Sequence, residues 1–366
     1  MELRRTAVRF LELLLFGAAP LLLMGACLGD ATAAGPHHSD FWTFWSAGRD
    51  VLHGHSPYPA LQSLPHEAYR KFAPFVYPPV TAFTMVPLAL LPYWAAKVVY
   101  LLLSVGAIAL SMRLLGVRDW RCFGAVFACA PAYAAVGLGA VGPFLALGAA
   151  LAWRYRDRAV VAGLAVAYVI SAKLFLWPLW FWLVRTRRYR AAAVAAGAGL
   201  GAVLASWAAI GFAGLREYPQ LLGRLTELVG PHGYSIYALE RSLGIGNIAA
   251  ERSLYVFAFV ALALVALFVR DDRRVFVAVI AISLFATPIL WPHYLVLLVV
   301  PIALVTTRLS PLWIAPALLW IDAPAWSKGP AWTGSLLVLV TVIAVAAMWR
   351  RIAPIPRLHV GPLTEV

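Results

Sequence analysis

Apolar residues occur in long blocks along this chain, and the charged residues are concentrated in short stretches between the blocks. The first block runs from Phe10 to about Leu28, and a helix of that length can cross the ~30 Å hydrocarbon layer of a bilayer. Similar blocks follow as far as about residue 349, so the first is interpreted as a retained membrane helix and not as a signal peptide. The pattern predicts an all-α polytopic membrane protein.

Several apolar blocks are too short to cross a bilayer alone. Stretches of ~10–14 apolar residues are typical of broken or re-entrant helices, and such irregular backbone is tolerated only where protein encloses it. We therefore expect a single domain over residues 1–350, built from about 11–12 transmembrane or broken helices around a cavity, followed by a short tail over 351–366. The short blocks lie at about 122–138, 143–153, 159–170 and 174–184.

The composition supports insertion into a membrane. Hydrophobic residues make up 63% of the chain and charged residues 13%, whereas a soluble domain has ~45–50% and ~25%. The formal net charge is +14, but the basic residues cluster between apolar blocks as in cytoplasmic loops, so no nucleic-acid partner is expected. The three cysteines lie within apolar blocks, which predicts neither disulfides nor a thiolate metal site.

Placing every basic cluster in the cytoplasm gives one consistent topology. Both termini are then cytoplasmic, and two long extracytoplasmic loops cover about 30–78 and 213–252. A transporter is expected to hold its polar groups near the midplane of the bilayer, and here they gather at the outer surface, which favours chemistry there. A transporter or lipid flippase remains the alternative. The histidines predicted on the outer side are His37, His38, His53, His55, His66, His232 and His293.

Two histidine pairs in the first outer loop, His37/His38 and His53/His55, raise the question of a metal site. H-x-H spacing can bind Zn²⁺ or Cu²⁺. However, no HExxH or comparable ligand frame accompanies the pairs, so the sequence predicts no metal and no cofactor.

Asp40 lies in the stretch HHSDFWTFWSAG, directly after the first apolar block. Aromatic and small residues recur behind it at helical spacing, which predicts a short amphipathic helix over about 40–52 whose aromatic face points into the lipid or the bundle. Ser39 or Asp40 can be the N-cap of this helix. Asp40 can also be a general base held over a cavity, and the two interpretations are compatible.

Four further residues are candidates for chemistry, each with a structural alternative. Lys173, between two short apolar blocks, can bind a phosphate or extend from a helix end to the interface. Arg241 in the second outer loop has the geometry to bind phosphate, or it pairs with a nearby carboxylate. His293 can donate to a phosphate oxygen or shuttle a proton, and Tyr77, beside two prolines, can be an ordinary interfacial tyrosine.

Five stretches taken in order resemble glycosyltransferase family 87, the polyprenyl-phosphate-mannose-dependent α-mannosyltransferases of the GT-C superfamily. The resemblance runs over roughly residues 8 to 350, and its weight rests on the order and spacing of the stretches. They read DFWTFWSAGRDVLHGHSPY, FVYPPVTAFTMVPLALLP, AKLFLWPLWFWLVRTRRYRAA, YSIYALERSLG and ATPILWPHYLVLLVVPIAL.

The resemblance implies a GT-C-type bundle and assigns roles to single residues. Asp40 matches the acidic base at the start of the first outer loop. The residues matched to the donor phosphate and sugar are Lys173, Arg241, His293 and Tyr77, and Tyr58 and Ser235 are candidates for further substrate contacts.

The implied reaction is a single inverting displacement at the extracytoplasmic face of a bacterial cell membrane. A sugar, mannose in most of the family, would pass from a polyprenyl-phosphate donor to a glycolipid or lipid-anchored glycan, with cationic side chains neutralising the leaving phosphate. The chain departs from the family pattern at Ala140, where a glutamine is usual, and before Ser235, where the family commonly reads N-Q-S. These departures keep arabinose or another pentose or hexose open as the sugar.

Overall fold

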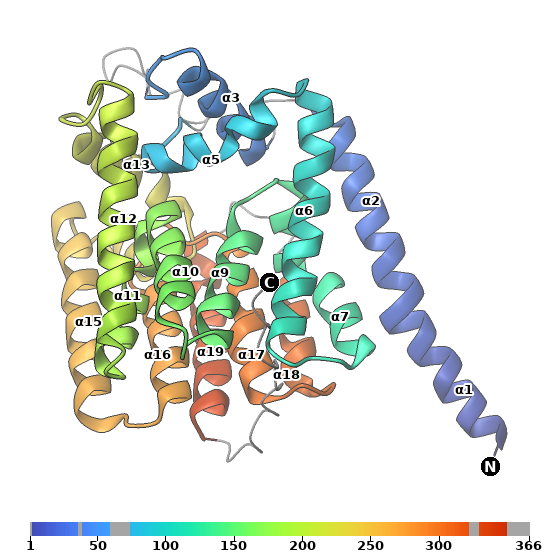
Figure 1. Ribbon diagram of the computed structural model, residues 1–366. Coiled ribbons are helices and arrows are strands. Elements are labelled where there is room, and N and C mark those ends of the chain that lie inside the picture. Colours follow the sequence, from blue (N-terminus) through green and yellow to red (C-terminus); the bar gives the residue numbers. More distant parts are fainter. Residues whose placement is uncertain (1, 36–38, 59–73, 322–328, 350–366) are drawn as a thin grey trace, which may run out of the picture.

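The structure is a computed structural model, and it describes residues 2–35, 39–58, 74–321 and 329–349. Over these ranges every regular element is a helix (Figure 1). The elements are α1 (Glu2–Leu13), η1 (Leu14–Ala18), α2 (Ala19–Ala33), α3 (Asp40–Leu52), α5 (Pro79–Ala89), α6 (Tyr93–Leu114), α7 (Trp120–Phe127), α8 (Ala130–Gly137), α9 (Gly142–Arg154), α10 (Ala159–Ala172), η4 (Leu174–Leu176), α11 (Pro178–Arg185), α12 (Tyr189–Ala209), α13 (Tyr218–Val229), η5 (Gly230–His232), α14 (Ile236–Ser242), α15 (Asn247–Phe268), α16 (Asp272–Phe285), η6 (Pro292–Leu298), α17 (Val299–Val305), α18 (Pro311–Ile314), η7 (Ala315–Ile321) and α19 (Gly329–Trp349).

Four helices are long and apolar enough to cross a membrane. The first is the continuous rod of α1, η1 and α2, which stands at the side of the bundle in Figure 1, so the predicted first membrane helix is confirmed. The predicted all-α polytopic architecture is confirmed with it. The four spans are Leu3–Ala33, Tyr93–Leu114, Tyr189–Ala209 and Asn247–Phe268.

Shorter and broken helices fill the space between these spans. α8 and α9 together are apolar enough for one span, but the chain bends by 114° between them. Gly139 in the turn between them has a φ of +63°, which a residue without a side chain adopts at little cost. The expected segment at 122–138 is two helices, α7 and α8, and the expected segment at 174–184 is the 3₁₀ turn η4 followed by α11.

The amphipathic helix predicted at 40–52 is present as α3. Ser39 is its N-cap, since the Ser39 hydroxyl accepts a hydrogen bond from the backbone N–H of Trp42 at 3.3 Å. Phe41 and Phe44 are fully buried, so the aromatic face packs into the bundle and not into lipid. Burial of each ring contributes about 1.5–3 kcal/mol to stability. Gly48 lets α5 approach closely, because a Cβ there would lie 3.1 Å from that of Met85.

The two ends of the bundle carry different chemistry. α3, α5 and α13 lie together at one end, and the turn between α15 and α16 lies at the other (Figure 1). The basic cluster Arg185, Arg187 and Arg188 belongs to this second end, where it shares a cavity with Arg270. Asp40 therefore starts a helix at the end of the bundle opposite to this arginine cluster.

Candidate active site

The carboxylate of Asp40 is positioned by contacts on both sides of the start of α3. The Ser39 hydroxyl caps the helix and lies 3.1 Å from the hydroxyl of Tyr93 on α6. The backbone N–H of Phe41 donates to the carbonyl of Leu138, in the turn between α8 and α9, at 3.3 Å. A Cβ on Gly139 would lie 2.7 Å from that of Phe41, so this turn is pressed against the first turn of α3.

His293 faces Asp40 from the far end of the chain. Its Nε2 lies 3.8 Å from Oδ2 of Asp40, which is longer than a hydrogen bond. The side chain is buried, and Nε2 has no hydrogen-bond partner among the residues that the structure describes. The start of α9 holds the backbone in place, because a Cβ on Gly142 would be 2.9 Å from the carbonyl oxygen of His293. A polar ligand atom within hydrogen-bond distance of Nε2 would satisfy this buried nitrogen.

Lys173 provides a cation beside the same pair. It lies in extended conformation between α10 and η4. Its ammonium lies 4.1 Å from the ring centroid of Tyr77 and 5.0 Å from that of Tyr294. Both rings attract a cation electrostatically. Within the described parts of the chain the ammonium makes neither a hydrogen bond nor an ion pair, so its three donors stay open to an anion.

The electrostatic surroundings tune Asp40. Burial raises the pKa of the Asp40 carboxyl to about 6, and the nearby charge of Lys173 lowers it in part. About a third of the side chain stays exposed, 32%, so a substrate can reach it. At pH 7 the ionised form exceeds the protonated form by roughly tenfold. Asp40 is thus a carboxylate that can accept a proton near neutral pH.

Tyr77 connects the cation to the aromatic core. Its ring is buried and meets Phe44 of α3 edge to face at 4.9 Å. Tyr58 lies behind it, because the Tyr58 hydroxyl donates to the Tyr77 carbonyl at 2.6 Å and the Tyr58 ring stacks on Trp207 at 5.0 Å. Tyr58 therefore supports the backbone of Tyr77, and none of its contacts among the described residues is with Asp40.

Ser235 and Arg241 lie apart from this group. The Ser235 hydroxyl donates to the carbonyl of Pro288 at 2.6 Å and accepts from the N–H of Ala238, so it caps α14. Arg241 donates to the carbonyl of Ile245 at 2.7 Å. No contact among the described residues joins either side chain to Asp40, Lys173 or His293. The structure brings together four of the seven predicted site residues: Asp40, Lys173, His293 and Tyr77.

Sequence reasoning missed Tyr294 and Tyr93. Tyr294 supplies the second ring against Lys173 and forms a side-chain hydrogen bond with Tyr77. Its position directly after His293 was the available signal. Tyr93, whose hydroxyl meets the cap of α3, gave none, because it follows a proline at the start of an ordinary apolar helix.

No three His, Cys, Asp or Glu side chains come together as a metal site in the described ranges. His37 and His38 of the two pairs considered above lie outside these ranges. The residues present are one cation, one buried imidazole and one carboxylate. The chemistry that they can support is proton abstraction by Asp40 beside an anion that Lys173 binds by charge and His293 by a hydrogen bond.

The family model described as Glycosyltransferase family 87 matches residues 75–301. This span covers more than half of the chain. The chain belongs to glycosyltransferase family 87. The resemblance found in the sequence is thereby confirmed. The match includes Tyr77, Lys173, Ser235, Arg241 and His293, and Asp40 and Tyr58 precede it.

One curated relative of this family 87 protein comes from Mycolicibacterium smegmatis strain mc(2)155. It is named a polyprenol-phosphate-mannose-dependent alpha-(1-2)-phosphatidylinositol pentamannoside mannosyltransferase and is 27% identical over 267 residues. The alignment covers 68% of this chain and 61% of the relative, so the chain spans about three fifths of the relative's length. No solved structure matches this family 87 chain.

Proposed function

We propose that this protein transfers mannose from a polyprenyl-phosphate donor to a hydroxyl of a lipid-linked acceptor, with Asp40 as the general base. The observation that carries the proposal is the buried Nε2 of His293, which has no hydrogen-bond partner among the described residues and lies 3.8 Å from the Asp40 carboxylate, together with the unpaired ammonium of Lys173. A carboxylate, a cation and a buried unsatisfied imidazole around one point suit a reaction that releases a phosphate and takes up a proton. The printed name of the mycobacterial relative supports the donor.

Asp40 accepts the proton of the acceptor hydroxyl as the hydroxyl oxygen attacks the anomeric carbon. Its pKa of about 6 keeps it ionised at neutral pH while leaving it basic enough for the transfer. Its place in the first turn of α3 favours the ionised form further, because the positive end of the helix dipole lies there. About a third of the Asp40 side chain is exposed, so an acceptor hydroxyl can reach it.

Lys173 and His293 act on the donor. As the bond between the anomeric carbon and the phosphate oxygen breaks, its electron pair stays on the phosphate, and the additional negative charge meets the ammonium of Lys173. His293 Nε2, which lacks a partner, can donate to a phosphate oxygen when it carries the proton. No contact among the described residues joins Arg241 to Asp40, and we propose Arg241 as a contact to the lipid-linked end of the donor.

A single base opposite a leaving phosphate gives one displacement with inversion at the anomeric carbon. A β-linked donor then yields an α-linked product. Aspartate is the one carboxylate in this cluster, so a covalent glycosyl–enzyme intermediate is not part of the mechanism. The alternative donor is a polyprenyl-phosphate pentose such as arabinose, or another hexose. The reason is Ala140, which replaces the glutamine usual in the family and lies in the turn that touches α3.

The site lies on the extracytoplasmic side of a bacterial cell membrane in this proposal, and both termini are cytoplasmic. The support is the distribution of arginines. The cluster around Arg185 and Arg270 lies at the end of the bundle away from α3 (Figure 1), and loops rich in Lys and Arg stay in the cytoplasm.

Transfer by the purified full-length protein tests the proposal. Radiolabelled polyprenyl-phosphate-mannose and polyprenyl-phosphate-arabinose are supplied in separate reactions with a membrane glycolipid extract, and the anomeric configuration of the product is read by NMR. We expect α-mannosyl product. Arabinosyl product alone would replace the sugar and keep the mechanism, and β-linked product would refute the single displacement.

A further inference from the structure

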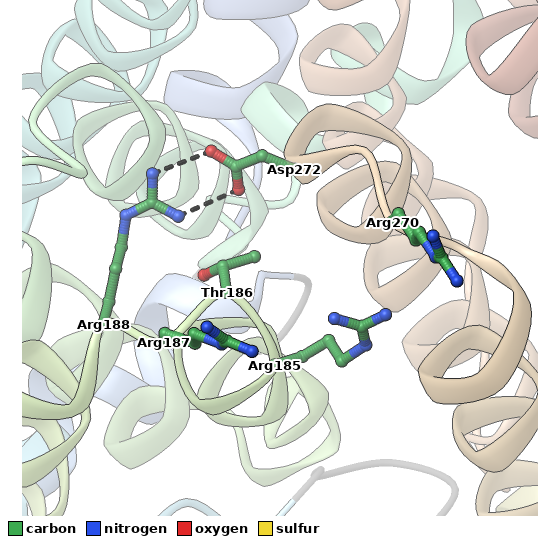
Figure 2. A pocket seen from close by; sticks show the side chains of 6 residues that line it. All are labelled: Arg185, Thr186, Arg187, Arg188, Arg270 and Asp272. Carbon is green, nitrogen blue, oxygen red and sulfur yellow. Dashed lines mark hydrogen bonds and ion pairs between the residues drawn. The ribbon is translucent and has the colours of Figure 1, made fainter.

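A second polar site lies at the end of the bundle opposite to Asp40. A cavity of about 520 Å³ opens between the end of α11 and the turn that joins α15 to α16 (Figure 2). It uses none of the residues that surround Asp40, so the proposed transfer reaction leaves it unexplained. Its lining residues are Arg185, Thr186, Arg187, Arg188, Arg270 and Asp272.

The cavity carries a surplus of positive charge. Four arginines and one aspartate line it, which gives +4 and −1, a net +3. Two neighbours outside the lining, Arg156 and Asp157, cancel each other.

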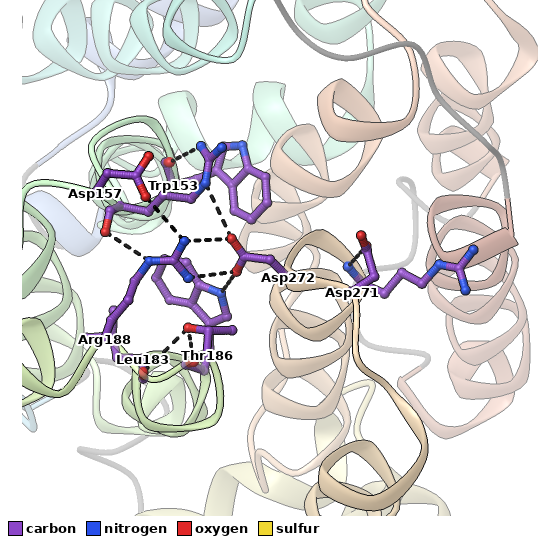
Figure 3. A network of polar contacts seen from close by, with 10 residues as sticks. Trp153, Asp157, Leu183, Thr186, Arg188, Asp271 and Asp272 are labelled. Carbon is purple, nitrogen blue, oxygen red and sulfur yellow. Dashed lines mark hydrogen bonds and ion pairs between the residues drawn. The ribbon is translucent and has the colours of Figure 1, made fainter. Parts of the chain in front are cut away.

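Two of the four arginines are already committed to the fold. Arg188 pairs with Asp272 at 2.8 Å (Figure 3). The Trp182 indole donates to the same carboxylate at 2.7 Å. Arg185 donates to the carbonyls of Ala266 and Val269 at 3.1 and 2.8 Å. These contacts make one rigid wall of the cavity.

The other two arginines are free to bind a ligand. Arg187 and Arg270 are exposed, and their guanidinium groups make no hydrogen bond or ion pair with the residues that the structure describes. Figure 2 shows the two on opposite elements, Arg187 at the end of α11 and Arg270 before α16. An anion in the cavity would face a cation from each element.

The backbone at Arg187 is a second, independent indication. Its φ is +59°, a region that favours glycine. Arg187 lies in the turn that terminates α11. The N–H of Arg188 donates to the carbonyl of Leu183, and the N–H of Arg187 donates to the carbonyl of Val184. A chain that keeps arginine where glycine would be less strained retains the side chain for an interaction outside the backbone.

An apolar space continues from the charged one. A second cavity of about 360 Å³ shares Arg270 and is lined also by Phe268, Val269, Arg274 and Met348. Phe268 ends a helix long enough to cross the membrane and is 75% exposed. Arg270 therefore lies where the apolar span gives way to the charged turn, which is the level of a lipid headgroup.

We infer that this site binds the phosphate of an anionic lipid headgroup, with Arg187 and Arg270 as the charged contacts and the cavity beside Phe268 and Met348 receiving the start of an acyl chain. Arginine suits this role because its planar guanidinium donates two parallel hydrogen bonds to phosphate oxygens. A free phosphate would use the same arginines but would gain nothing from the apolar cavity.

The test measures lipid binding to the purified full-length protein in a neutral detergent. Fluorescent phosphatidylglycerol and phosphatidylcholine with identical acyl chains are titrated separately, and inorganic phosphate is added as a competitor. The double variant Arg187→Gln/Arg270→Gln is compared with Arg9→Gln/Arg118→Gln, which removes two exposed arginines from outside the cavity. We expect phosphatidylglycerol to bind more tightly than phosphatidylcholine and the first variant to bind it about 30-fold more weakly.

Arg187→Gly separates binding from folding. Glycine relieves the positive φ, so the melting temperature should stay or rise while the affinity for phosphatidylglycerol falls. Equal affinity in wild type and the Arg187/Arg270 variant would overturn the inference, as would an equal loss in the control variant. Displacement of phosphatidylglycerol by stoichiometric inorganic phosphate would assign the site to a free anion and refute the lipid.

Discussion

Replacement of Lys173 by methionine tests the electrostatics of the candidate active site. The side chain keeps its length and its contact with the rings of Tyr77 and Tyr294 but loses the ammonium that lies 4.1 and 5.0 Å from their centroids. Two effects follow. The leaving phosphate loses one preorganised cation, and Asp40 loses the charge that holds its pKa down.

The first effect lowers the rate. Removing one group that stabilises developing negative charge typically costs ~10²–10³ in kcat, and we expect Lys173→Met to fall in that range. The second effect shifts the pH profile. Asp40 must be ionised to accept a proton, so activity falls as the pH drops through its pKa of about 6. Without Lys173 that pKa rises, and the acidic limb of kcat/KM moves to higher pH.

The assay is kcat/KM for mannosyl transfer across pH 5 to 9, with the variant and wild type in the same detergent. Lys97→Met is the matched control, because Lys97 also lies over a tyrosine ring, that of Tyr93 at 5.5 Å, and donates to a carbonyl at 3.2 Å. An acidic limb that stays in place in Lys173→Met would refute the coupling of Lys173 to Asp40, whatever the rate. An equal shift in Lys97→Met would show that the loss of any buried ammonium produces it.

Three further predictions concern the support of the site, each checked by denaturant unfolding or by the transfer assay. Ser39→Ala removes the cap of α3 and should lower the free energy of unfolding by about 1 kcal/mol, whereas a Thr replacement should recover it. Gly48→Val should lower it by about 1–3 kcal/mol, because even a Cβ would lie 3.1 Å from that of Met85; unchanged stability would mean that α3 and α5 can separate. Tyr58→Phe loses the 2.6 Å hydrogen bond to the Tyr77 carbonyl and should lower the free energy of unfolding by about 1 kcal/mol, with little change in KM. A raised KM at unchanged stability would instead make Tyr58 a substrate contact.

Local patterns predicted α3 well. Aromatic residues at helical spacing after Ser39-Asp40 give both the start of the helix and its buried stripe. The same pattern could not say whether the stripe meets lipid or protein, because Phe and Trp are favourable in both surroundings. That answer depends on α5 and α6, which begin at Pro79 and Tyr93, outside the pattern itself, and on the small residue Gly48 that lets α5 approach.

The candidate site shows the opposite case. Asp40, Lys173 and His293 are each separated by more than a hundred positions along the sequence, so no local pattern predicts their distances, and the resemblance to family 87 supplied the grouping. Arg241 illustrates the limit of that route. The family pattern placed it with the donor phosphate, while its observed contact is the local one to Ile245. The bend between α8 and α9 had a local signal in GLGAVGP, but its 114° angle depends on packing against α3 and η6.

The central claim is that Asp40 is the base of a glycosyl transfer, and Asp40→Asn tests it most directly. The amide keeps the size of the side chain and cannot accept the proton. Transfer from radiolabelled polyprenyl-phosphate-mannose should fall by ~10²–10⁴, with the melting temperature unchanged and donor binding retained. Wild-type transfer rates in Asp40→Asn would contradict the account and remove Asp40 from the mechanism.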